Sequence, residues 1–245
     1  MASMNEIHEE TFTVRTWDVD GCDGLSMAAA FNYCQEIAGI HANELGVGMD
    51  SMREKGAAWI LSRMSLELSR RPGWGKTLRC RTWPRGAERL FVYRDYEIED
   101  DAGIFARGRS AWLVLDIAKK RPLRPESWIE SLPLNADRAA LDGGASAVGE
   151  LVDSAPCGER RAAYSDIDYN KHVNNARYIQ WVQDCLSFDE LSSWPAMRCD
   201  INYLSEVKEG ELIALHRAPS SGGWAVEGRK GEAPAFRACI RPLSV

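Results

Sequence analysis

The feature that most constrains this chain of 245 residues is an internal repeat. The segment DVDGCDGLSMAAAFNYCQE, residues 18–36, aligns with DIDYNKHVNNARYIQWVQD, residues 166–184, at an offset of 148 residues (166 minus 18). In this alignment Asp20 meets Asp168, and apolar and aromatic positions coincide further along. Because a repeat of this kind decides the architecture, the chain is expected to contain two units of the same fold.

The hydrophobic patterns around the repeat predict the same order of elements in both halves. In the first half a strand at residues 10–17 precedes a helix at residues 25–45. Strands are then predicted at residues 57–68, 77–84, 90–99 and 105–116, with a hairpin turn at 100–103. In the second half the pattern predicts a strand at 160–164, a helix at 173–186 and strands at 197–207, 211–217, 223–228 and 235–242. The fold class is therefore α+β, with an antiparallel sheet around a long helix in each half.

Proline, glycine and small residues are concentrated between the two halves, which is typical of a linker. We therefore expect a first module at residues 1–120, a linker at 121–155 and a second module at 156–245.

Composition excludes several classes of protein. A net charge of −6 argues against general nucleic-acid binding. No apolar run approaches the ~20 residues of a membrane helix, and residues 1–12 lack the apolar core of a signal peptide. The seven cysteines are scattered without a C-x-x-C pair, and the four histidines form no convincing metal set. These observations predict a soluble, cytoplasmic protein without metal, cofactor, nucleic-acid partner or membrane partner.

The second copy of the repeat carries polar groups that the first copy lacks. Asp168, Asn170 and His172 follow each other at every second residue, so an extended chain places their side chains on one side. A carboxylate beside an imidazole and an amide can orient and activate water. Asp and Asn are also ordinary helix caps and turn residues. In the first half, however, His172 faces Gly24 and Asn170 faces Cys22, which favours one working site and one silent site.

The predicted start of the second helix adds an electrostatic argument. Backbone N–H groups in a first helical turn lack internal partners and favour a developing negative charge. We therefore expect the N–H of Val173 to help polarise a substrate carbonyl, an effect worth about 10²–10³ in rate for one well-placed donor.

At this point the pattern D-x-N-x-H-V-N-N-x-x-Y, from Asp168 to Tyr178, resembles the acyl-acyl-carrier-protein thioesterases of fatty-acid synthesis. These enzymes belong to the wider group of hotdog-fold thioesterases. The resemblance extends over nearly the whole chain, because the family joins two hotdog modules of which the first is silent and the second active. It implies a tandem hotdog fold, in which each module wraps a sheet around a long helix and the two sheets join side by side.

The resemblance also implies the roles of the site residues. The family has a further acid in a Y-x-x-E context, which here is Tyr203 and Glu206. Glu206 would activate water, Asp168 would position that water, and Asn170 and His172 would hold the thioester carbonyl. Val207 stands where an older proposal for plant members places a nucleophilic cysteine. Both carboxylates stay candidates for the general base, because coupled acids can exchange roles. Glu206 could also be an ordinary exposed strand acid; aligning the glycine turns puts Arg71 opposite it in the first half.

Two further residue sets follow from the family resemblance and from the charge distribution. The acyl chain is expected in an apolar tunnel of the first module, where each candidate could equally be ordinary core: Met27, Phe31, Trp59, Ile60 and Met64. A basic stretch in an otherwise acidic protein suggests docking of an acidic carrier protein, although solvated strand faces explain it as well. The docking candidates are Arg70, Arg71, Lys76 and Arg79.

The leading function is hydrolysis of a fatty acyl thioester on a phosphopantetheine-bearing acyl carrier protein, which terminates chain elongation. An acyl-CoA thioesterase on the same fold is the first alternative. A non-hydrolytic acyl-binding protein and a hotdog dehydratase are further alternatives, disfavoured by the complete polar site and by the asparagine-rich motif. A homodimer is left open, since a tandem hotdog supplies internally the pairing that single hotdogs obtain by dimerising.

Overall fold

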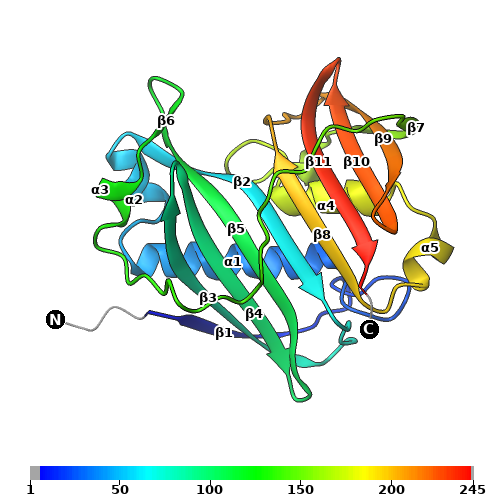
Figure 1. The fold of residues 1–245 in the computed structure, drawn as a ribbon, viewed down its shortest axis with the longest axis horizontal. Helices are drawn as coiled ribbons and strands as arrows, with labels where there is room; N and C mark the ends of the chain where they lie inside the picture. Colours follow the sequence, from blue (N-terminus) through cyan, green and yellow to red (C-terminus); the bar gives the residue numbers. More distant parts are fainter. Residues whose placement is uncertain (1–5, 244–245) are drawn as a thin grey trace.

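The computed structural model describes residues 6–243. The first half of the chain contains five long or medium strands, one short strand, one long helix and two short helices (Figure 1). Their bounds are β1 (His8–Thr13), α1 (Met27–Glu44), α2 (Met49–Glu54), β2 (Ala57–Leu68), β3 (Thr77–Glu88), β4 (Phe91–Asp100), β5 (Gly103–Asp116), β6 (Arg121–Leu123) and α3 (Glu126–Ile129).

The second half repeats this order with shorter helices. Its bounds are β7 (Ala155–Arg161), the 3-10 helix η1 (Tyr164–Asp166), α4 (Asn175–Gln183), α5 (Phe188–Ser192), β8 (Met197–Tyr203), β9 (Leu212–Ser220), β10 (Gly223–Lys230) and β11 (Ala233–Pro242). The order of one strand, one helix and four strands, expected from the repeat, is therefore confirmed in both halves.

All strands belong to one antiparallel sheet, in the order β1-β3-β4-β5-β2-β8-β11-β10-β9-β7, with β6 beside β5. The order of these ten strands is symmetrical about the centre: each strand of the first half except β6 corresponds to the strand numbered six higher. The two halves join where β2 pairs antiparallel with β8, from Arg63 opposite Asn202 to Leu68 opposite Met197. The predicted α+β fold of two hotdog modules with their sheets side by side is confirmed.

The helices α1 and α4 lie together behind this sheet and pack against each other (Figure 1). Each begins at a polar cap: Ser26 Oγ accepts from the N–H of Ala29, and Asn174 Oδ1 accepts from the N–H of Ala176. Their buried faces share one hydrophobic cluster that runs through both halves. The start of α4 therefore has a fixed position against the middle of α1, where Asn175 Nδ2 contacts Gln35 Oε1 at 3.3 Å.

The predicted bounds differ from the observed ones mainly at loops. The helix predicted at 173–186 begins two residues later, at Asn175, because residues 166–174 form a compact loop closed by backbone hydrogen bonds. The first strand ends at Thr13 rather than at residue 17. The helices α2 and α5 were not predicted, since six and five residues carry too little periodicity.

The segment between the halves crosses in front of the sheet on its way from α3 to β7 (Figure 1). Polar contacts hold it there: the N–H of Ala140 donates to Asp95 at 2.8 Å, and that of Ala145 donates to Ser65 Oγ at 2.7 Å. The segment thus covers one face of the sheet while α1 and α4 occupy the other. Within residues 6–243, no helix has the length and apolar character needed to cross a membrane.

Candidate active site

The two copies of the repeat fold into the same loop. The N–H of Asp168 donates to the carbonyl of His172 at 3.0 Å, and in the first half the N–H of Asp20 donates to the carbonyl of Gly24 at 3.0 Å. Each aspartate also caps its own loop, since Asp168 Oδ1 accepts from the N–H of Asn170 and Asp20 Oδ1 from that of Cys22. Residues that align at an offset of 148 therefore form equivalent hydrogen bonds in the two halves.

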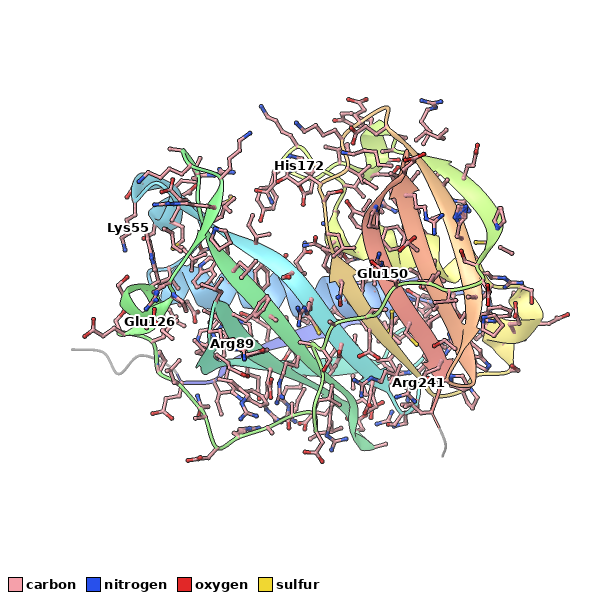
Figure 2. All side chains as sticks on the ribbon, turned by 45° about the horizontal axis from the view of Figure 1, so that its top comes forward. Lys55, Arg89, Glu126, Glu150, His172 and Arg241 are labelled. Carbon is pink, nitrogen blue, oxygen red and sulfur yellow. The ribbon has the colours of Figure 1, made fainter. Side chains whose placement is uncertain are left out.

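The loops share a strained position as well. Lys171 has φ of 65° and Asp23, its counterpart, has φ of 58°, in the left-handed region that few non-glycine residues adopt. This turn bends the chain so that His172 comes back beside the strand that follows the helix. Figure 2 shows His172 at the upper rim of the molecule.

At this rim His172 Nε2 lies 2.9 Å from Glu206 Oε2. Glu206 stands three residues beyond the end of β8, and the side chains of His172 and Glu206 are 28% and 59% exposed. His172 and Glu206, which are far apart in the chain, are thus in direct contact and open to solvent. An imidazole held by a carboxylate in this way has a fixed ring orientation.

Asn170 receives a contact from the other half of the molecule. Arg53 Nη2, at the end of α2, lies 3.4 Å from Asn170 Oδ1. Because the amide oxygen accepts from Arg53, the Nδ2 group of Asn170 is left as a donor for a substrate oxygen. Arg53 was not anticipated from the sequence, since it is distant in the chain and belongs to a helix that the pattern did not reveal.

The expectation for Val173 is wrong. Its N–H donates to the carbonyl of Val207 at 2.8 Å, so it is not available to polarise a substrate carbonyl. The physical reason is that Val173 precedes α4 and forms part of the loop, where its N–H ties the loop to the chain just beyond Glu206. Val173 therefore helps to place His172 beside Glu206.

Tyr178 and Tyr203 hold in place the two segments that carry His172 and Glu206. Tyr178 of α4 packs edge-to-face on Tyr203, with ring centroids 5.5 Å apart, and Tyr203 donates its hydroxyl to the carbonyl of Asn175 at 3.1 Å. Burial raises the pKa of both phenols, so both stay protonated at neutral pH. They fix α4 to β8, from which Glu206 follows.

In the first half, an arginine occupies the place of Glu206. The N–H of Leu25 donates to the carbonyl of Pro72, as that of Val173 does to Val207, so Arg71 is the counterpart of Glu206 as the alignment indicated. Arg71 Nη1 lies 2.5 Å from Asp20 Oδ2, and the arginine side chain is only 7% exposed. A Cβ added to Gly24 would lie 2.8 Å from Arg71 Cβ. The first-half loop therefore has no room for a histidine.

The basic residues proposed for carrier docking do not form one free surface. Arg71 is buried against Asp20, which excludes it as a docking residue. Arg70 forms two hydrogen bonds to Asp100, and Arg79 lies 3.2 Å from Glu99. The sequence did not reveal the acids that neutralise these charges.

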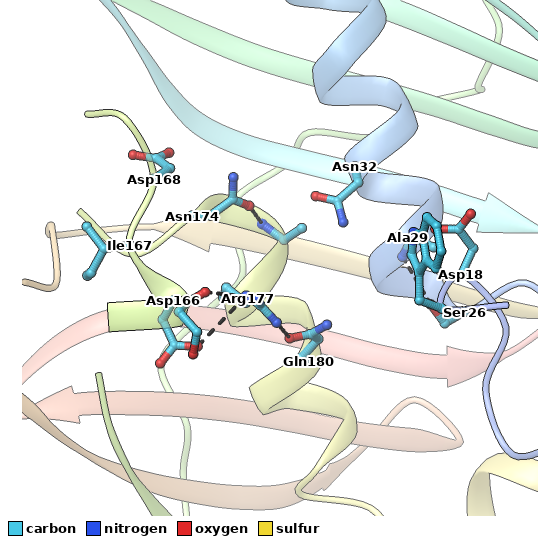
Figure 3. Close-up of a pocket in the computed structure, with 13 residues that line it drawn as sticks. Asp18, Ser26, Ala29, Asn32, Asp166, Ile167, Asp168, Asn174, Arg177 and Gln180 are labelled. Carbon is cyan, nitrogen blue, oxygen red and sulfur yellow. Dashed lines mark hydrogen bonds and ion pairs between the residues drawn. The ribbon is translucent and has the colours of Figure 1, made fainter. Parts of the chain in front are cut away.

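A polar groove with a volume of about 420 Å³ adjoins the candidate site (Figure 3). It lies between the first half of α1 and α4, and both Asp168 and Asn174 face it. The other lining residues are Trp17, Asp18, Ser26, Ala29, Asn32, Ser165, Asp166, Ile167, Ala176, Arg177 and Gln180. Water can therefore reach Asp168 from this side.

A second, apolar cavity starts on the other side of α4 and enters the first half. Its volume is about 10 Å³, room for one water molecule. Of the acyl-pocket candidates, Phe31 and Met64 line it, whereas Met27, Trp59 and Ile60 do not. The remaining lining residues are Gln35, Leu61, Tyr96, Trp112, Asn175 and Ala176. Strand alternation gives the inward face of each strand, but only the register between strands brings these residues together.

Comparison with known proteins gives a consistent result. The family model described as the acyl-ACP thioesterase N-terminal domain (ACP, acyl carrier protein) matches residues 5–129, and the model of the C-terminal domain matches residues 154–232. Among solved structures, an acyl-ACP thioesterase from Bacteroides thetaiotaomicron superimposes with a TM-score of 0.87 and 25% identity, covering 98% of this chain and 99% of the other. A 12:0-ACP thioesterase from Umbellularia californica has the same fold, with a TM-score of 0.80, 21% identity and 97% of each chain covered.

Curated relatives come from plants. The chloroplastic palmitoyl-acyl carrier protein thioesterase of Gossypium hirsutum is 26% identical over 84% of this chain and 54% of its own length. The chloroplastic oleoyl-acyl carrier protein thioesterase of Coriandrum sativum is 25% identical over 86% of this chain and 62% of its own. The chain thus spans between half and two thirds of the length of these relatives.

Proposed function

The chain belongs to the acyl-ACP thioesterase family, and on this premise we propose that it hydrolyses fatty acyl-ACP to a free fatty acid and the carrier protein. The observation that carries the proposal is the contact between His172 and Glu206 beside Asp168 and Asn170, in the second of two otherwise equivalent loops. In a fatty-acid-synthesising system, this reaction terminates chain elongation.

The proposed reaction needs only water and these side chains. Nδ2 of Asn170 and the imidazole of His172 hold the thioester carbonyl. Glu206 takes a proton from water as the water oxygen attacks the carbonyl carbon, and Asp168 positions the water from the polar groove. The C–S bond then breaks, and the thiolate of the phosphopantetheine receives the proton. General-base catalysis of this kind contributes roughly 10²–10⁴ in rate.

The first half supplies the acyl pocket in this proposal and has no catalytic role. Its support is the arginine at position 71, which fills the place of the missing site, and the cavity between Phe31, Met64 and the start of α4. That cavity must widen to accept a chain. Met64 is suited to this, since its unbranched side chain adopts several shapes at low cost. We keep residues 1–120 and 156–245 as the two modules and 121–155 as the linker.

We propose a carrier-docking surface at the rim of the site in place of the earlier candidates. Arg53 contacts Asn170, and Lys171 and Lys208 are exposed in the two site loops. These three cations lie around the point that the thioester must reach. Their field favours an acidic carrier protein and accelerates its association at low salt.

Location in the cell enters the proposal only as an expectation. The curated relatives are named as chloroplastic, and for this chain the cytoplasm is kept as a prediction.

The test is thiol release from acyl-ACP and acyl-CoA substrates of several chain lengths. We expect faster hydrolysis of the carrier-protein substrates, and a loss of at least about 10²-fold in His172→Ala, because the carbonyl loses a donor. His216→Ala is the matched control, since His216 lies on β9, outside the candidate site, and activity should be retained. Preference for CoA would change the substrate class, and turnover of neither would favour an acyl-binding protein.

A further inference from the structure

A buried arginine lies on the inner face of the first half. Arg94 on β4 is 8% exposed, and within residues 6–243 it forms no ion pair with a carboxylate. Its Nη1 donates to His41 Nδ1 at 3.0 Å and to Thr82 Oγ1 at 3.2 Å. A guanidinium has only donors, so Nδ1 of His41 must be the acceptor in this contact.

The register of the sheet places Arg94 in line with the apolar cavity. Met64 on β2 is directly opposite Ser110 on β5, and Ser110 is directly opposite Arg94 on β4. Side chains in one such row share a face of the sheet. Two residues that line the cavity also form hydrogen bonds with Ser110. Tyr96 shares a hydrogen bond of 2.9 Å with Ser110 Oγ, and Trp112 Nε1 donates to the same oxygen at 2.7 Å.

The row of residues from the cavity to the buried arginine therefore changes from apolar to polar. From Met64, which lines the cavity beside the start of α4, the row continues to Ser110 and to Arg94 over two strand spacings, about 10 Å. We call Arg94, Thr82, His41 and Ser110 the Arg94 cluster. All four are buried, and none belongs to the proposed catalytic apparatus.

An alkyl chain is a poor complement to this cluster. Buried charges in proteins are normally paired with an opposite charge or fully hydrogen-bonded, because desolvation of an unpaired charge is expensive. Methylene groups driven against the guanidinium would remove its remaining access to water and return no hydrogen bond. An oxygen acceptor at the same place would receive a charge-assisted hydrogen bond, which is stronger than one between neutral groups.

We propose that the Arg94 cluster binds an oxygen atom near the distal end of the acyl chain, so that the preferred substrates are medium-length acyl-ACPs carrying a distal hydroxyl, oxo or carboxylate group. This inference rests on the proposed thioesterase function and names the class of acyl chain that the same site takes.

The first experiment compares acyl-ACP substrates of equal chain length with and without a terminal oxygen. Unsubstituted, ω-hydroxy and ω-carboxy chains of six to twelve carbons are supplied to the full-length protein, and kcat/KM is measured for each. At the best length the oxygenated substrates are expected to be about tenfold to a hundredfold better, the range for a hydrogen bond to a charged group. Unsubstituted chains that are hydrolysed as well or better at every length would overturn the inference and leave the proposed function intact.

The second experiment replaces the guanidinium. Arg94→Met should lower kcat/KM for oxygenated chains and raise it for unsubstituted ones. Replacing a buried charge by a residue of similar volume is often neutral for stability. Arg107→Met is the matched control, since Arg107 is exposed on the neighbouring strand β5, and its ratio of the two substrate classes should not change. An equal effect of Arg94→Met on both classes would show a purely structural arginine.

Binding gives a readout that does not depend on turnover. The free ω-hydroxy and ω-carboxy acids should raise the Tm of the unsubstituted protein more than the plain acid of the same length, and Arg94→Met should remove the difference. If the protein does not hydrolyse acyl-ACP but the Tm difference between the acids is present, only the proposed enzymatic function is wrong. Equal Tm shifts for all acids would contradict the role of the Arg94 cluster.

Discussion

At the scale of single residues, the two loops of the repeat differ in what stands beside the aspartate. In the second half Glu206 contacts His172, and in the first half Arg71 contacts Asp20 across the space above Gly24. The first half, with Gly24 in place of His172 and Arg71 in place of Glu206, thus has a closed ion pair where the second half has an open polar site. The backbone of both loops is retained, because their hydrogen bonds are made by main-chain atoms and by the aspartates.

The roles of the two carboxylates can be separated by isosteric variants. Glu206→Gln should lower kcat by about 10²–10⁴, as expected for a general base. Asp168→Asn keeps the capping oxygen for Asn170, so a smaller loss of kcat is expected. The measurement is kcat and KM of both variants with one acyl-ACP. The opposite ranking would assign the base role to Asp168.

Removal of Arg71 should lower the free energy of unfolding and leave the catalytic activity unchanged. Arg71→Ala leaves Asp20 without its partner in a partly buried place, with an expected loss of about 1–3 kcal/mol in the free energy of unfolding. Urea denaturation measures it, and Arg107→Ala is the exposed control. A loss of activity without loss of stability would show that the first-half loop takes part in catalysis.

At the scale of elements, turns and caps fix where each helix and strand ends. The hairpin between β4 and β5 is closed by Asp100, whose side chain accepts from the N–H of Ala102 and from both terminal nitrogens of Arg70. The side-chain hydrogen bonds from Arg70, assisted by its charge, hold the pKa of Asp100 below its usual range. This one carboxylate therefore joins the end of β2 to the tip of the neighbouring hairpin.

The hairpin contact predicts a pH dependence with a definite sign. Because the pKa of Asp100 is depressed in the folded state, its contribution is present above the unfolded pKa of about 4 and is lost as the pH falls through the folded value. Asp100→Asn should thus be less stable than the parent at pH 7, with a difference that shrinks toward pH 2–3. Urea midpoints across this range test it, and a constant difference would exclude the ionic contact as its cause.

At the scale of the whole molecule, the two halves share a sheet and a core. Across the junction of β2 and β8, Ser65 Oγ contacts Asp200 at 2.5 Å and Arg198 contacts Glu67 at 2.7 Å. One hydrophobic cluster includes α1, α4 and the inner faces of both halves. The pairing that two single hotdogs would need a dimer to form is thus made within one chain.

This continuity predicts a single unfolding transition. Leu66→Ala, in the fully buried row of β2 at the junction, should cost about 2–5 kcal/mol and move the whole transition without splitting it. Far-ultraviolet and near-ultraviolet circular dichroism in urea would report the midpoints. Separate midpoints for the two signals would contradict a single transition.

The sequence by itself determined the duplicated fold, because periodicity and the repeat are local properties that each half carries twice. It also determined that the polar group at 168–172 belongs to the second half only, and that an arginine opposes Glu206. The roles of these residues in catalysis stay predictions, to be tested by the variants above.

Only the tertiary structure decided which groups are in contact. Donors and acceptors far apart in the chain become partners through strand register and loop closure, which no local pattern encodes. The N–H of Val173 donates to the carbonyl of Val207, and Arg71 is buried against Asp20. Arg53 of the first half contacts Asn170 of the second. Arg94 lies in line with the cavity beyond Met64. A charge read from sequence has a sign and a position in the chain, but its partner, and so its energy, depends on the packing of the whole molecule.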